Sequence, residues 1–244
     1  LNQVLRVYST DKELLKTFKN LEKNKFYQII TEIKKNPRIL YQFGNYEKKL
    51  KNDNSFKIEF LPNNILTKNF QMKKYNKKDK NNGILFIFQI GKYNIKNYLH
   101  LNLLNNMMSE DFFNTIRTQQ QVGYLVHQNT KTINNYLYLI QHVQTSEPVN
   151  KVIKLIKNFN KNFLKNYKVY LKNNFDKYQK NFLIEIQKEP ENLMDLYSKD
   201  LSLIINSRSF NIDKLLVQNL KKINQINLFS FAKNILNNPI IYTL

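Results

Sequence analysis

The chain has three histidines, His100, His127 and His142, which are its candidate ligands for a catalytic metal. A catalytic zinc ion needs three protein ligands that converge on one point. None of these histidines has a second histidine or a carboxylate at a spacing that would bring both to one helical face. We therefore expect no metal site in this chain. His127 and His142 could face each other across a hairpin, where they are expected to form a polar cross-strand pair.

Nucleophilic catalysis has even fewer candidates. The chain contains no cysteine, which excludes a thiolate nucleophile, a thiolate zinc site and a disulfide framework. No Gly-x-Ser-x-Gly, Ser-x-x-Lys or phosphate-binding glycine loop stands in a supporting context, and the chain has only four glycines. The neighbouring carboxylates Glu110 and Asp111, and Glu189 and Glu191, are typical of helix starts. The sequence does not predict a complete active site.

One segment is distinctive, and it resembles the insulinase family of metallopeptidases. Residues 112–124 read FFNTIRTQQQVGY. In that family, the C-terminal half carries a Phe-Asn-x-Leu-Arg-Thr run, followed by a glutamine and a Gly-Tyr pair. Ile116 stands where the family has leucine. Five positions in the window from 117 to 124 match in identity and spacing: Arg117, Thr118, Gln121, Gly123 and Tyr124.

The resemblance implies a clamshell of two bowl-shaped halves that enclose a chamber for peptides, each half made of two related α+β domains. Zinc belongs to the N-terminal half, which carries an inverted His-x-x-Glu-His motif, and nothing in this chain matches that motif. Zinc is therefore expected in the full-length protein and not in this segment. The implied partners are the N-terminal zinc-bearing half of the same protein and peptide substrates.

By the same resemblance, Arg117 and Tyr124 project toward the catalytic cleft and complete the site when the halves close. The planar guanidinium group of Arg117 would hold carbonyl oxygens of the substrate and so position the scissile bond. The phenol of Tyr124 would stabilise the oxyanion formed at the zinc held by the other half. Taken singly, either residue has an ordinary alternative: Arg117 as a cation at a helix C-terminus and Tyr124 as an aromatic strand residue.

Hydrophobic periodicity predicts helices and strands in an order typical of an α+β two-layer sandwich, with helices over one face of a mainly antiparallel sheet. Ser109 to Asp111 are predicted to separate two helices, and the polar loop 129–135 to join two strands. The predicted strands are 39–43, 56–61, 70–74, 84–90, 124–128, 136–143 and 240–244. The predicted helices cover 11–20, 26–33, 95–108, 112–122, 149–163, 171–186, 194–204, 215–220 and 226–236.

The domain organisation follows from a polar, lysine-rich stretch at 46–54. Residues 1–54 are predicted to be the tail of a preceding insulinase-type domain, with two helices and its last strand, and residues 55–244 a complete C-terminal domain of that type. Phe43 stands where the family often has histidine in a His-Gly-Asn sequence, and the helix that follows is shortened. The segment Ser146-Glu147-Pro148 before a long helix also fits the last domain.

The formal net charge of +21 is carried almost entirely by lysine, since only four of the 39 basic residues are arginines. A nucleic-acid-binding protein usually uses arginine for phosphate and base contacts, so we expect no nucleic-acid partner. The longest apolar runs are too short to span a bilayer, so no membrane partner is expected either. The chain opens without an initiator Met and reads as a segment of a longer protein, for which a cytoplasmic location is favoured but not established.

These features predict a non-catalytic C-terminal segment of a peptide-degrading zinc endopeptidase, inactive in isolation. The alternative is a catalytically inactive structural subunit with the same fold, as in mitochondrial processing and respiratory complexes. Arg117 and Tyr124 argue against that alternative because a purely structural subunit has little use for the pair.

Overall fold

The computed structural model describes residues 11–35, 68–72, 74, 78–206 and 208–244. The chain divides into two compact units, one formed by residues 66–189 with 209–244, the other by residues 1–65 with 190–208. The predicted strands at 39–43 and 56–61 and the boundary at 46–54 lie outside the described residues. The division of the chain into residues 1–54 and 55–244 stays a prediction.

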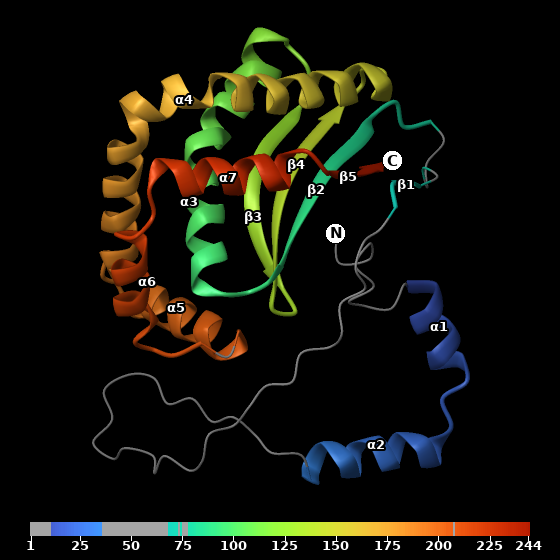
Figure 1. Cartoon of the computed structure of the whole chain (residues 1–244). Coiled ribbons are helices and arrows are strands. Elements are labelled where there is room, and N and C mark those ends of the chain that lie inside the picture. Colours follow the sequence, from blue (N-terminus) through green and yellow to red (C-terminus); the bar gives the residue numbers. More distant parts are fainter. Residues whose placement is uncertain (1–10, 36–67, 73, 75–77, 207) are drawn as a thin grey trace. The chain divides into compact units, whose positions relative to one another are not determined.

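A five-stranded sheet forms the centre of the larger unit, in the order β1-β5-β2-β4-β3 (Figure 1). Of the neighbouring pairs, only β1 with β5 is parallel, so the sheet is mainly antiparallel, as predicted. Strand β3 lies at one edge. The strands are β1 (Phe70–Gln71), β2 (Asn82–Lys92), β3 (Leu125–Ile133), β4 (Tyr136–Thr145) and β5 (Ile240–Thr243).

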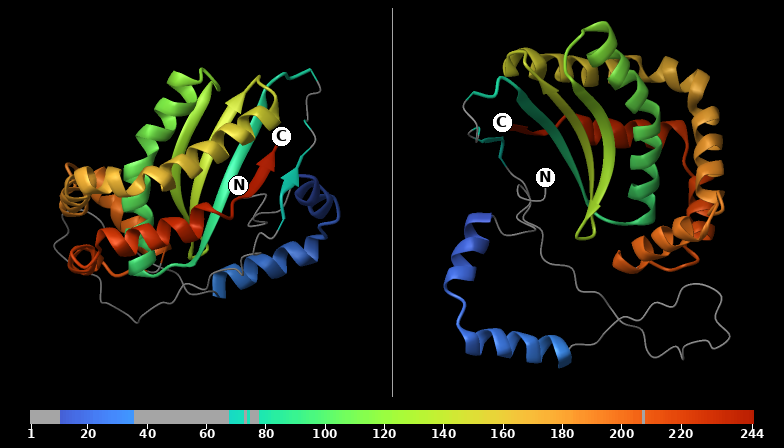
Figure 2. Two further views of the ribbon diagram at one scale, coloured as in Figure 1. Left: turned by 45° about the horizontal axis from the view of Figure 1, so that its top comes forward. Right: turned by 180° about the vertical axis from the view of Figure 1, so that it is seen from behind.

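Helices cover one face of this sheet, which confirms the predicted α+β two-layer sandwich. Figure 2 shows α4 and α7 on the same side of the strands, and α3 packs against β3 and β4. The helices of this unit are α3 (Ile95–Phe113), the π-helix η1 (Asn114–Gln119), α4 (Val149–Gln187), α6 (Ile212–Leu220) and α7 (Gln225–Leu236). The buried residues Phe86, Phe88 and Leu139 lie on the face of the sheet that carries Gln141, which bonds to α4.

Buried amides join the sheet to two of its helices. Gln141 on β4 and Asn160 on α4 exchange hydrogen bonds of 2.8 and 2.9 Å, and Gln141 also donates to Gln128, its partner across β3 and β4, over 2.8 Å. Gln128 in turn donates to Asn105 on α3 over 3.3 Å. Each bond satisfies a polar group that would be costly to bury alone, so the network fixes α3 and α4 on the strands.

Three local predictions were wrong, each for an identifiable reason. Helix α3 continues through Ser109 because no glycine or proline interrupts it and Phe112 is buried on the same helix. The predicted loop 129–135 shortens to a turn at Asn134 and Asn135, whose φ angles of 47° and 65° suit a tight hairpin of the primed type.

The two helices predicted at 149–163 and 171–186 are one helix of 39 residues, α4. Its buried stripe runs on without interruption, because Tyr167 is buried between Phe163 and Leu171 at intervals of one helical turn. Figure 1 shows that α4 turns a corner, so that its two arms point in different directions.

The smaller unit contains the helices α1 (Asp11–Lys19), α2 (Lys23–Lys35) and α5 (Leu193–Ile205), each predicted from its period. The apolar face predicted for α1 carries Leu14, Leu15 and Phe18, which are 56%, 55% and 75% exposed. No helix among the described residues of the chain is long and apolar enough to cross a membrane.

The amide network predicts that Asn160→Ala destabilises the chain by about 1–3 kcal/mol, because it removes both hydrogen bonds between Asn160 and the buried amide of Gln141. The matched control is Asn158→Ala, an exposed position on the same helix, since both changes gain the same helix propensity. Denaturant unfolding of the two variants measures the difference. Equal unfolding midpoints would contradict the role given to the network.

Candidate functional site

The segment that carries Arg117 and Tyr124 begins where α3 widens into the π-helix η1. The Gln120 N–H donates to the Thr115 carbonyl over 3.1 Å, five residues back, instead of the usual four. The Val122 N–H then reaches the Ile116 carbonyl over 3.0 Å. Ile116 and Val122 are both buried, so the segment between them is fixed to the core at each end. Segments of π-helix are rare, and they occur frequently at functional sites.

Two residues between η1 and β3 have left-handed backbone conformations, Gln121 with φ 52° and Gly123 with φ 94°. Glycine is needed at position 123 for a second reason, because the site is closely packed. A Cβ on Gly123 would lie 2.8 Å from Val126 Cγ2 and 3.2 Å from the Gln144 carbonyl oxygen. The Gly-Tyr pair of the motif therefore marks a position where the turn comes into close contact with β3 and β4.

Arg117 lies in the last turn of η1, and its guanidinium Nη1 donates a hydrogen bond to the Gly123 carbonyl oxygen. That carbonyl belongs to the peptide unit that leads into Tyr124. The side chain of Arg117 remains exposed. Because one guanidinium has five N–H donors, the bond to Gly123 fixes the group and leaves further donors for a second partner.

Tyr124 is held by its backbone and presents its side chain to solvent. Its N–H donates to the Gln144 carbonyl over 2.7 Å, and its side chain is 64% exposed. The phenol oxygen lies 3.4 Å from the hydroxyl of Ser146, its one side-chain hydrogen-bond partner among the described residues. The sequence motif pointed to Arg117 and Tyr124, and the structure has both at one turn. The sequence did not predict the contact of Tyr124 with Ser146, although the Ser-Glu-Pro segment was recognised.

The histidines do not form a metal centre. His127 and His142 face each other across β3 and β4, as predicted, with ring centroids 5.0 Å apart and planes nearly perpendicular. Burial lowers the pKa of His142 to about 4, with a smaller contribution from His127. The third, His100, is buried, with ring nitrogens 2.7 Å from the Lys96 carbonyl and 3.2 Å from Asn227 Oδ1.

Across the described parts of the chain, no three histidine, cysteine, aspartate or glutamate side chains are grouped to hold a metal ion. The insulinase resemblance implies a zinc ion in the N-terminal half of the full-length protein. The histidines of this chain do not fit a zinc site, because His127 and His142 supply only two ligands between them.

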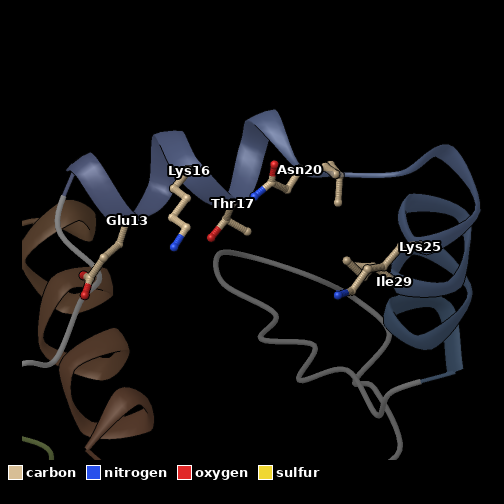
Figure 3. Close-up of a pocket in the computed structure, with 7 residues that line it drawn as sticks. Glu13, Lys16, Thr17, Asn20, Lys25 and Ile29 are labelled. Atoms are coloured by element: carbon tan, nitrogen blue, oxygen red, sulfur yellow. The ribbon is translucent and has the colours of Figure 1, made fainter.

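The smaller unit contains a pocket of about 440 Å³ between α1 and α2 (Figure 3). Its lining includes one carboxylate, from Glu13, and the ammonium groups of Lys16 and Lys25. Among the described residues, no histidine or serine lines it.

Part of this chain is similar to known proteins. Residues 103–200 match the family described as PQQ synthase PqqF-like, C-terminal lobe domain 4. No curated protein matches the sequence. The fold is similar to that of pitrilysin, with a TM-score of 0.61 and 15% identity, over 68% of this chain and 19% of pitrilysin. The chain therefore spans about a fifth of that protein.

Two further solved structures have the same fold. One is the peptidase M16 inactive domain from Pseudomonas fluorescens, with a TM-score of 0.53 and 10% identity over 72% of this chain and 42% of that one. The other is a protease from Helicobacter pylori, with a TM-score of 0.61 and 8% identity over 92% of this chain and 52% of that one. Together with the family match, they confirm the resemblance to the C-terminal part of an insulinase-family peptidase.

The geometry of the turn predicts that Gly123→Ala destabilises the chain by about 2–4 kcal/mol, since it combines a positive φ with overlap against β3 and β4. Gly91→Ala is the matched control, because Gly91 has φ 122° but a Cβ at that position would meet no atom within 4 Å. We expect it to cost only about 1 kcal/mol. Denaturant unfolding tests this order, and a Gly91 variant as unstable as the Gly123 variant would contradict the packing argument.

Proposed function

We propose, from the premise that residues 103–200 match the PqqF-like C-terminal lobe family, that this chain is the non-catalytic C-terminal part of an insulinase-type zinc endopeptidase. In this proposal it supplies substrate-binding and oxyanion-stabilising groups to a site whose metal is held elsewhere. The observation that carries the proposal is the bond from the Arg117 guanidinium to the Gly123 carbonyl, which places the arginine beside the exposed Tyr124.

Tyr124 is the proposed oxyanion stabiliser. When a peptide carbonyl is attacked, its oxygen gains negative charge, and a phenol O–H donates a stronger hydrogen bond to that oxyanion than to the ground-state carbonyl. A donor of this kind must be fixed before the reaction begins. The backbone bond from Tyr124 to Gln144 and the close packing of Gly123 support that requirement.

Arg117 is the proposed substrate-positioning residue. Its guanidinium group has donors beyond the one given to Gly123, in a planar arrangement that suits carbonyl oxygens of a peptide main chain. A lysine ammonium would carry the same charge without this geometry. The peptide is therefore held by main-chain contacts, which fits a peptidase that degrades peptides of varied sequence.

Zinc is proposed for the N-terminal half of the full-length protein, where it would polarise the carbonyl and activate the attacking water. The residues of this chain contribute donors and shape. In the proposal, the N-terminal half and the peptide substrate are its partners, and the isolated chain is inactive.

The proposal predicts that Tyr124→Phe lowers kcat of the full-length protein by about 10²- to 10³-fold, with a much smaller change in KM, because the lost donor acts mainly in the transition state. Steady-state hydrolysis of a fluorogenic peptide measures both constants. Tyr136→Phe is the matched control, since Tyr136 lies at the opposite end of the hairpin formed by β3 and β4.

Turnover by Tyr124→Phe equal to that of the wild type would contradict the role of the tyrosine. A full-length protein that hydrolyses no peptide at all would favour the alternative of a structural subunit.

Arg117→Lys adds a separate check, because loss of the planar donors should raise KM more than it lowers kcat.

A further inference from the structure

Gln121 occupies an unusual position in the turn between η1 and β3. Its φ of 52° lies in the left-handed region, which residues other than glycine, asparagine and aspartate seldom adopt. At the end of a helix this conformation is usually provided by glycine. The chain instead has a glutamine there, at a position that also matches the motif shared with the insulinase family.

The side chain of Gln121 does not explain this choice through contacts within the described residues. It is exposed, and its carboxamide makes no hydrogen bond to any residue that the structure describes. The neighbouring Val122 is buried and bonds back to Ile116, which fixes the backbone of the turn. An exposed amide is thus carried on a fixed backbone, at a conformational cost that no hydrogen bond of this amide within the described residues offsets.

Arg117, the substrate-positioning residue proposed above, cannot accept a hydrogen bond. Arg117 has only donors, and the Gly123 carbonyl is already engaged by its guanidinium. A peptide main chain presents both carbonyl oxygens and N–H groups, so a site that binds it needs an acceptor as well. The carboxamide of Gln121 offers one acceptor and two donors, and it lies in the chain between Arg117 and Tyr124.

We propose that Gln121 is a substrate-positioning residue whose carboxamide pairs with a peptide unit of an extended substrate, accepting from its N–H and donating to its carbonyl oxygen. The ligand is the peptide main chain, so binding by Gln121 is independent of the substrate's side chains. This proposal rests on the proposed function, because it places the substrate beside Arg117 and Tyr124.

The test uses the full-length protein and three variants. Gln121→Gly removes the carboxamide and suits the left-handed backbone, so we expect KM for peptides to rise about tenfold, while the melting temperature stays the same or increases. Gln121→Asn keeps a shorter amide and tolerates the same φ, so its KM should lie between those of the wild type and Gln121→Gly. Gln120→Ala is the matched control, an exposed glutamine with an ordinary φ of −89°, and its KM should not change.

The rise in KM should be the same for peptides of different sequence, since the contact is with the main chain. A wild-type KM in Gln121→Gly, together with impaired turnover in Tyr124→Phe, would overturn this inference and leave the proposed function intact. Wild-type behaviour of both variants would overturn both. A rise in KM that occurs equally in Gln120→Ala, or only with a lowered melting temperature in Gln121→Gly and Gln121→Asn, would also overturn the inference.

Discussion

The pair of hydrogen bonds between Gln141 and Asn160 is the interaction on which the arrangement of this fold depends. Both amides are buried, and each satisfies hydrogen-bonding groups of the other that would be costly to bury alone. The pair joins α4 to β4, and the continuation through Gln128 to Asn105 joins α3 to the edge strand β3. Helix α3 and strand β3 are the two elements that flank the turn with Arg117 and Tyr124. The position of the candidate site therefore follows from a polar network in the core.

Unfavourable local features are concentrated in this same short turn. The π-helix η1, the left-handed Gln121 and the closely packed Gly123 occur within ten residues of one another, between α3 and β3. Such features persist where the surrounding core holds them, and they are common where side chains must be presented in fixed positions. Arg117 and Tyr124 are presented to solvent on this backbone. Hydrogen bonds fix the backbone that carries these two donor side chains. The described part of the chain contains no grouped metal ligands.

The sequence was sufficient for the elements whose patterns are local. The strands predicted at 84–90 and 136–143 correspond to β2 and β4. The sequence was insufficient where tertiary packing decides the extent of an element or a contact between distant segments. The burial of Tyr167 joins the two predicted helices into α4, and the π-helix η1 contains the buried Ile116. The contact of Tyr124 with Ser146 joins segments that are separate in sequence. Polar side chains such as Gln141 and Asn160 gave no sign that they would lie in the core, because their type is usually exposed.

The central claim is that this chain supplies donors to a site whose metal is held by another part of the protein. The most direct measurement is hydrolysis of a fluorogenic peptide with added zinc, by the purified chain alone and after mixing with an N-terminal half that carries the zinc motif. The account predicts no hydrolysis by the chain alone and chelator-sensitive hydrolysis by the mixture. Chelator-sensitive cleavage by the purified chain alone would contradict it.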